Sequence, residues 1–427
     1  MTQKFYPLLG ETIYREQLEN GLTVIVVPRP GFQKKLVYFA THYGAIHTRY
    51  FRDGREETSP AGVAHYLEHK LFDMPQGEVS AVFAARGANP NAFTSYDMTA
   101  YHFSCTEHFE ENLALLVEFV LTPYFTGESV EKEQGIIAQE IDMTADTPEN
   151  RVFEMLMEAM YREHPIRVPI LGTRQTIGRI TPQVLTDCHS AFYTPENMIL
   201  CVVGDVKIEQ VCRVAKEAIP ATIATSAQRV ETYAEPMTCD THYVSAAMEV
   251  AMPMFQLGFK CESAGTGEAA VRAEMVGDLA AEALFGESSP LYQKLYEQGC
   301  IDSSFGGGYE TVDGMAMLTA SGDSNDPVAV RDAILETARQ LCSRGIPQAD
   351  FLRMKRSSFG RRLRDLDSFD STCFRVCAYH FSGFDYFRFP EVYQDISAKE
   401  VEEFIHRVVT PARCCLSVIS PAKEDTQ

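Results

Sequence analysis

Two histidines and a glutamate lie within five consecutive residues, His65-Tyr66-Leu67-Glu68-His69. In a helix, a spacing of four residues places the two imidazoles on one face, about 6 Å apart along the axis. Both rings can then reach one cation at roughly 2.0–2.1 Å, the usual Zn–N distance. Glu68 flanks the same face and can take a proton from a water held by that cation. The pattern predicts a zinc site that activates water for hydrolysis; the alternative is an ordinary amphipathic helix with polar or core histidines.

A catalytic zinc site needs a third protein ligand, because such sites use three side chains and leave one position for water. A second helical pattern downstream, over residues 130–141, and the residue that follows it offer four carboxylates: Glu131, Glu133, Glu140 and Asp142. Glu133 and Glu140 are seven residues apart and therefore share a face of that helix. Composition alone does not choose between the four.

The elements that must position these side chains follow from hydrophobic periodicity. In the first half of the chain we expect strands at 12–15, 22–27 and 36–42, with helices at 62–72, 79–86, 109–121, 130–141 and 151–161. In the second half we expect a strand at 248–259 and helices at 268–285, 328–343 and 349–363. Strands packed on one side by helices are typical of a two-layer α+β sandwich.

One pattern occurs twice in the chain. Ile180-Thr181, Thr194-Pro195, Leu200 and Val202 are matched 216 residues later by Ile396-Ser397, Thr410-Pro411, Leu416 and Val418. In each copy a polar cap opens an amphipathic helix, Thr-Pro follows its end, and a strand comes next. We therefore expect an internal duplication of one α/β-sandwich domain, an antiparallel-rich sheet with helices packed on it. Residues 1–225 would form the metal-binding domain and 226–427 a homologous domain without a metal, with a linker at 221–228.

Composition and charge exclude several classes of function. The chain has 38 basic and 59 acidic residues, a formal charge of −21, which repels nucleic acid and anionic membrane surfaces. The sequence has no apolar run of 18 residues, so we expect no membrane span. The first ten residues lack the apolar segment of a secretory signal. Several of the 12 cysteines lie in apolar-periodic segments, as free core thiols do. We expect a cytoplasmic protein.

Three sequence blocks carry a family resemblance: HYLEHKLF at 65–72, GANPNAFTSYDMTAYHF at 87–103 and EKEQGIIAQEI at 131–141. In this order they resemble the pitrilysin/insulinase family of inverzincin zinc peptidases, which includes mitochondrial processing peptidase. The resemblance covers essentially the whole chain and is closest to the bacterial YmfH-like proteases. It implies a zinc metalloendopeptidase that hydrolyses peptides in a closed chamber, with one Zn²⁺ per chain. It further implies that His65, His69 and Glu140 bind the zinc and that Glu68 is the general base. Glu133 is implied to be a catalytic residue that supports the zinc ligands without binding the zinc itself.

The substrate is expected to bind along an edge strand. Asn91-Ala92-Phe93-Thr94 and residues 98–103 predict two short strands around Tyr96-Asp97, and an exposed edge strand can pair with an extended peptide. The resemblance implies that Asn91 and Ala92 lie beside the zinc, and we take all four residues 91–94 as substrate-binding. The alternative is a plain hairpin packed in the core.

The resemblance also implies a partner. Family members that act alone carry an Arg and a Tyr in the second half, which contact substrate near the zinc. The corresponding stretch LYQKLYEQGCID, residues 291–302, has Tyr296 and Asp302 at the expected positions. A homologous subunit, in a heterodimer or a homodimer, would then complete the site. The competing interpretation is a noncatalytic or scaffold subunit of a heterodimer like processing peptidase, although such a subunit is expected to have lost ligands, and this chain retains them.

Two further patterns are interpreted as structural. Cys373, Cys377 and His380 fit buried positions on a helix at least as well as metal ligands. A run of basic residues interleaved with apolar ones at helical spacing is typical of a solvated helix face. Its members are Arg353, Lys355, Arg356, Arg361, Arg362 and Arg364.

Overall fold

The computed structural model describes residues 1–427 except 53, 221–226, 230–232 and 423–427. Its chain forms two compact units that alternate along the sequence. The first unit comprises Met1–Ile141, Pro169–Val230 and Leu363–Arg388, and the second comprises Asp142–Val168, Glu231–Arg362 and Phe389–Gln427. The predicted boundary between residues 225 and 226, and most of the predicted linker, lie outside the described residues. The division into 1–225 and 226–427 therefore stays a prediction.

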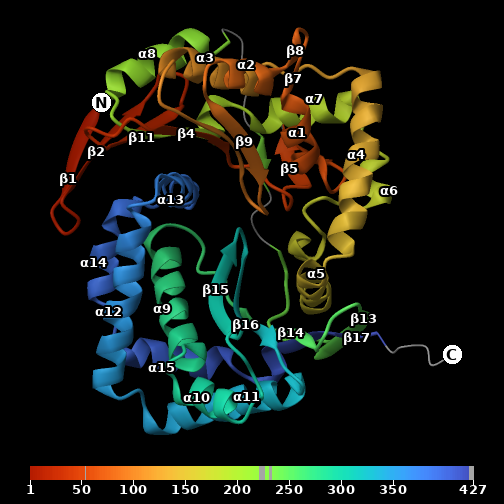
Figure 1. Ribbon diagram of the computed structural model, residues 1–427, viewed down its shortest axis with the longest axis vertical. Coiled ribbons are helices and arrows are strands. Elements are labelled where there is room, and N and C mark those ends of the chain that lie inside the picture. Colours follow the sequence, from red (N-terminus) through yellow and green to blue (C-terminus); the bar gives the residue numbers. More distant parts are fainter. Residues whose placement is uncertain (53, 221–226, 230–232, 423–427) are drawn as a thin grey trace. The chain divides into compact units, whose positions relative to one another are not determined.

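The first unit is built on a seven-stranded sheet in the order β1-β2-β3-β11-β4-β10-β9 (Figure 1). β3 and β11 run parallel, and the other neighbours are antiparallel. The strands are β1 (Thr2–Tyr6), β2 (Glu11–Gln17), β3 (Thr23–Pro28), β4 (Lys35–Thr41), β9 (Asn89–Thr94), β10 (Thr99–Cys105) and β11 (Met198–Gly204). Short strands pair separately: β5 (Arg49–Arg52), β6 (Arg55–Thr58) and β12 (Gln228–Arg229), and β7 (Asp73–Met74) with β8 (Gly77–Glu78).

Helices cover both faces of this sheet (Figure 1). On one face α1 (Val63–Leu71) packs on β9 and β10, α3 (Phe109–Leu121) on β4 and β10, and α8 (Ile208–Ala218) on β2 and β3. On the opposite face α13 (Phe369–Phe381) packs on β4 and β11. Because β11 is covered on both sides, its seven residues Met-Ile-Leu-Cys-Val-Val-Gly are all buried. The remaining helices of this unit are α2 (Val79–Ala85), α4 (Gly127–Ala145, which ends in the second unit), α6 (Arg174–Ile177) and α7 (Pro182–Phe192).

The second unit repeats the central part of this sheet. Its order, β13-β17-β14-β16-β15, and its strand directions match those of β3-β11-β4-β10-β9, including one parallel pair. The strands are β13 (Tyr243–Met248), β14 (Met254–Cys261), β15 (Gly306–Val312), β16 (Met315–Asp323) and β17 (Cys414–Pro421). Its helices are α5 (Pro148–Met160), α9 (Gly267–Phe285), α10 (Pro290–Glu297), α11 (Pro327–Arg344), α12 (Gln348–Asp365), α14 (Phe389–Gln394) and α15 (Ala398–Val408). The predicted α+β fold with an internal duplication is confirmed. The expectation of helices on one side of the strands only is wrong for the first unit, because α13 covers the second face of its sheet.

The two halves of the sequence exchange one helix. α5, from the first half, packs on β14 and β17 of the second unit, whereas α13, from the second half, packs on β4 and β11 of the first. β4 and β14 hold the same place in their sheets, as do β11 and β17. Each sheet therefore receives the cover of its second face from the other half of the chain.

Most predicted elements agree with the structure within four residues at each end, but the strand predicted at 248–259 is wrong. β13 ends at Met248 and β14 begins at Met254, so two strands lie where one was expected. The Val250 amide donates to the Met248 carbonyl at 3.0 Å, which turns the chain sharply. Pro253 follows, and proline cannot donate to a strand ladder.

The cysteines and the basic run that were interpreted as structural lie on two helices. Cys373 and Cys377 are buried on α13. The basic run lies on α12, where Arg353, Arg356, Arg361 and Arg364 are exposed as predicted. Arg362 is an exception to the prediction, because its side chain is only 5% exposed.

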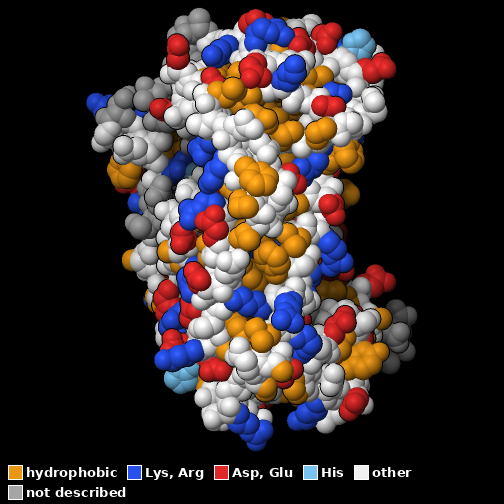
Figure 2. Space-filling model, turned by 90° about the vertical axis from the view of Figure 1, so that its left-hand side faces the viewer, with side chains coloured by type: hydrophobic (Ala, Val, Ile, Leu, Met, Phe, Trp, Pro, Cys, Tyr) orange, Lys and Arg blue, Asp and Glu red, His pale blue; other side chains and the backbone are white. Residues whose placement is uncertain are grey.

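On the face drawn in Figure 2, Lys and Arg side chains lie among Asp and Glu side chains, so the net negative charge forms no continuous patch there. None of the described helices combines the length and the apolar composition that a membrane span requires.

Candidate metal centre

The helix that carries the two histidines begins at a glycine. Gly62 has φ 95°, and a Cβ on it would lie 2.5 Å from the Leu171 carbonyl oxygen, so no other residue fits this turn. From there Val63, Leu67 and Leu71 of α1 enter the core of the first unit. Because this side of α1 faces the core, positions 65, 68 and 69 lie on another side of the helix.

The partner helix, α4, carries the carboxylates. Only Val130 and Ile137 of its 19 residues are buried, so apolar packing fixes little of its orientation. The Tyr66 hydroxyl of α1, which is buried, donates to the Val130 carbonyl oxygen. This bond fixes the register of α4 against α1.

Three ligand-type side chains meet between these helices. The Nε2 atom of His65 lies 3.6 Å from Oε1 of Glu140, and Nε2 of His69 lies 3.6 Å from Oε2 of the same carboxylate. One ligand atom from each of the three residues lies within 4.8 Å of the others. Zn–ligand bonds of 2.0–2.1 Å in a tetrahedron correspond to about 3.3 Å between ligand atoms. The donor set and its spacing therefore fit a zinc ion.

The burial and hydrogen bonds of the two rings set their orientation and their pKa values. Burial lowers the pKa of His65 to about 3, with His69 as a smaller cause, so this imidazole stays neutral, the form that ligates metals. Glu133 Oε1 accepts a hydrogen bond from His69 Nδ1 at 2.9 Å, and Nε2 of His69 is the ring nitrogen directed at Glu140. Burial alone would lower the pKa of His69, but this bond and the neighbouring carboxylates raise it.

Glu68 lies beside this set without belonging to it. Its Oε2 accepts a hydrogen bond from the Thr94 hydroxyl at 2.7 Å, which holds the half-buried carboxylate in place. Burial raises the pKa of Glu68, Thr94 and His69 lower it, and Glu140 raises it, with a net increase. A carboxylate with a raised pKa next to a metal-ligand set can accept and return a proton.

A buried lysine completes the surroundings, and sequence reasoning missed it. Lys70 is 1% exposed; its ammonium pairs with Asp73 and lies 3.7 Å from Oε2 of Glu133. Ser129 of α4 donates to the same Asp73 carboxylate at 3.0 Å. The sequence did offer a signal for it. Lys70 follows Tyr66 by one helical turn, so a charged residue lies on the same side of α1 as a core residue.

Strand β9 lies beside α1 and forms the edge of the sheet. Its residues alternate in direction. Thr94 faces Glu68, whereas the Phe93 ring packs 5.8 Å from Phe374 of α13 on the other face. The exposed Asn91 accepts a hydrogen bond from the Ala92 amide at 2.9 Å, so this edge amide is covered by a side chain. The structure thus places residues 91–94 on the accessible edge but divides their side chains between two faces.

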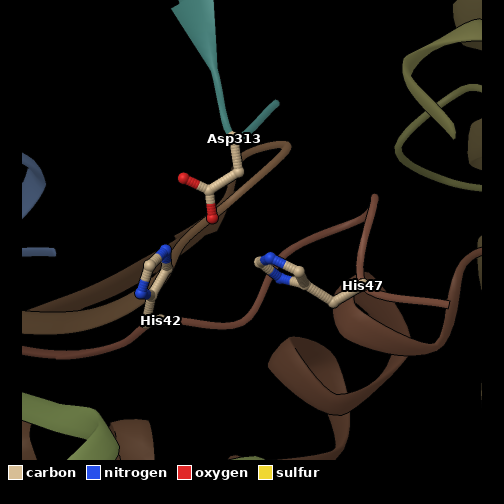
Figure 3. Close-up of side chains that lie close together, drawn as sticks. All are labelled: His42, His47 and Asp313. Carbon is tan, nitrogen blue, oxygen red and sulfur yellow. The ribbon is translucent and has the colours of Figure 1, made fainter. Parts of the chain in front are cut away.

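A second pair of histidines lies elsewhere in the first unit. His42 and His47 have ring centroids 5.7 Å apart in an edge-on arrangement (Figure 3). His42 stacks on Phe381 at 4.7 Å, and His47 Nδ1 accepts a hydrogen bond from the Gly44 amide at 2.9 Å. Within the described part of the first unit, no residue adds a third ligand atom to this pair. We interpret both rings as packing residues.

Comparison with known proteins identifies the family to which this chain belongs. Residues 54–174 match the family model described as Insulinase (Peptidase family M16), and residues 179–358 match that of the Peptidase M16 inactive domain. The chain belongs to the insulinase family, peptidase family M16.

Relatives and solved structures agree with this assignment. The chain is 35% identical to "Uncharacterized zinc protease YmfH" of Bacillus subtilis over 425 residues, which is 97% of this chain and 98% of the relative. A crystal structure of an M16-like peptidase from Alicyclobacillus acidocaldarius matches with TM-score 0.92 and 30% identity, covering 96% of this chain and 98% of that one. A protease from Helicobacter pylori shares the fold, with TM-score 0.83 and 20% identity over 96% of this chain and all of that one.

Proposed function

We propose that this protein is a zinc metalloendopeptidase. The observation that carries the proposal is the meeting of His65, His69 and Glu140 within 4.8 Å, with Glu68 beside them. Relatives that are named zinc proteases support it. We assign one zinc ion per chain to these three ligands.

The residues around the ion have separate tasks. A zinc ion held there supplies Lewis-acid polarisation of the scissile carbonyl and makes water more acidic. Glu68 takes the proton of the attacking water and delivers it to the leaving amine. The Thr94 hydroxyl holds Oε2 of that carboxylate, so Oε1 remains to exchange the proton. Glu133 keeps His69 in the tautomer that ligates the metal.

Substrate would bind along β9 as an added strand. Residues 91–94 then read the peptide main chain, which makes selection by side chains loose. An incoming carbonyl at Ala92 has to displace the Asn91 side chain from the amide it now covers. Because this displacement exchanges one hydrogen bond for another, its net cost is small, about 1 kcal/mol.

A homologous partner subunit, or a second copy of the chain, would complete the site and close a chamber around the peptide. The support is the second half of the chain, where Tyr296 is 53% exposed on α10 and Asp302 accepts hydrogen bonds from Ser304. No arginine stands at either of these two positions. We place the protein in the cytoplasm because all twelve cysteines are free, a state that a reducing compartment preserves.

The test separates metal binding from turnover. Glu68→Gln should retain zinc but lose peptide cleavage, whereas His65→Ala should lose both, in the presence of the partner or of a second copy. Zinc content is measured by elemental analysis and cleavage with a quenched peptide library. Full activity of Glu68→Gln would refute the assignment of the base. A protein that holds zinc but cleaves nothing, with its partner present, would favour the noncatalytic subunit.

A further inference from the structure

The second unit has a helix pair in the same chain positions as α1 and α4. Apart from the short strands β5 to β8, the order in the first unit is β4, α1, α2, β9, β10, α3, α4, and in the second unit it is β14, α9, α10, β15, β16, α11, α12. The strands in these two series pair identically. α9 and α12 are therefore the counterparts of the two helices that carry the metal-ligand set.

Between α9 and α12 lies a set of charged residues with the spacing of the metal site. Glu274 and Asp278 are four residues apart on α9, as His65 and His69 are on α1. One terminal nitrogen of Arg362, on α12, lies 2.8 Å from Glu274 Oε1 and 2.6 Å from Asp278 Oδ2. The Arg362 side chain is 5% exposed. One cationic nitrogen thus bridges two side chains of neighbouring turns.

The counterpart of the general base is also changed. Glu68 directly precedes His69, and Gly277 directly precedes Asp278. A Cβ on Gly277 would lie 2.3 Å from Cγ of Tyr309, a buried residue of β15. β15 is the counterpart of β9, which carries Thr94, the hydrogen-bond partner of Glu68. An aromatic ring fills the place where a base would stand.

We propose that the second unit contains a converted copy of the metal site, in which the Arg362 guanidinium takes the place of the cation and Tyr309 that of the base. The chain accordingly binds one metal ion, and the ion triad of Glu274, Asp278 and Arg362 joins α9 to α12 without a metal. The comparison with the first unit rests on the proposed function. The triad itself rests only on contacts within the second unit.

The first experiment restores ligands to the second unit in a chain whose first site has been removed. The parent for this test carries His65→Ala and His69→Ala, and to it are added Glu274→His, Asp278→His and Arg362→Glu. After equilibration with zinc and gel filtration, elemental analysis should find about one zinc per chain in the restored variant and almost none in its parent. Because the first site is absent from both chains, the result does not depend on whether that site binds zinc. A restored variant that is folded by circular dichroism and binds no zinc overturns the proposal.

The second experiment tests the triad in the natural chain and decides the question if the restored variant does not fold. Arg362→Met is compared with Arg361→Met, whose side chain is 46% exposed and pairs with Glu282 at 2.8 Å. Removing the buried guanidinium leaves two carboxylates facing each other, and the melting temperature should fall by about 10 °C. The neighbouring exposed substitution should cost at most about 2 °C. Neither loss should change with zinc or chelator. Equal losses in the two variants, or a loss that zinc reverses in Arg362→Met, would contradict the role of Arg362.

Discussion

Replacing Glu133 by leucine removes the hydrogen-bond acceptor that orients His69. The Nδ1–Oε1 distance is 2.9 Å and the Glu133 side chain is 15% exposed, so water screens this bond only in part. A hydrogen bond to a charged group contributes about 1.5–3 kcal/mol. Since 1.4 kcal/mol corresponds to a factor of ten in a dissociation constant, zinc affinity should fall about 10- to 100-fold.

The assay is a zinc titration against a chromophoric chelator at neutral pH, which yields the dissociation constant without reference to peptide cleavage. Glu131→Leu is the matched control, because Glu131 is exposed on the same helix two residues earlier. Its zinc affinity should equal that of the parent. Glu133→Gln, which keeps an acceptor oxygen but not the charge, should fall between the two. If Glu133→Leu binds zinc within about twofold of the control, the ligand set does not depend on this bond, and the supporting role assigned to Glu133 is wrong.

Three further predictions concern stability, turnover and acid. Lys70→Met should lower the free energy of unfolding by about 3 kcal/mol in urea, because it removes the ammonium from two carboxylates that keep only hydrogen bonds from Ser129 and His69; the exposed Lys132→Met should change it by less than about 0.5 kcal/mol. Thr94→Val should reduce kcat about tenfold and leave the zinc dissociation constant unchanged, since the hydroxyl bonds the base and no ligand. Burial raises the pKa of Glu235, but bonds from Lys260 and three backbone amides lower it below its usual range. The stability it contributes is present above the unfolded pKa of about 4.3 and is lost as pH falls through the folded pKa. Glu235→Gln should therefore be less stable at neutral pH and show a flatter decline in acid, by fluorescence-detected unfolding.

The local part of the candidate site could be predicted from the sequence. Helix geometry alone puts His65 and His69 on one face, and it gives Glu133 and Glu140 a common face. The structure has both arrangements. The spacing could not tell which carboxylate faces which ring nitrogen. That choice depends on the register of α4 against α1, which the buried Tyr66 hydroxyl sets through a contact between residues far apart in sequence.

Other features lay beyond sequence reasoning for the same reason. The apolar faces of α5 and α13 predict that these helices are buried, but nothing local states which sheet each one covers. Their exchange between the two halves depends on the tertiary arrangement of a duplicated chain. Arg362 was interpreted as one of a row of solvated arginines, because periodicity records position on a helix and not the carboxylates on a neighbouring one.

The two helix pairs can be compared by the charges that meet between them. In the first unit two imidazoles and one carboxylate converge from α1 and α4, and a divalent ion can satisfy all three. In the second unit the pair on α9 is Glu274 and Asp278, and two carboxylates one turn apart repel each other unless a positive group lies between them. Arg362 supplies that group from the covalent chain, so the contact needs no ion from solution. Replacing histidines by carboxylates and a glutamate by arginine therefore preserves attraction between the helices while removing an open coordination position. With Gly277 and Tyr309 at the place that corresponds to Glu68, the described helix pair of the second unit keeps the frame of the proposed site without a counterpart of its proposed base.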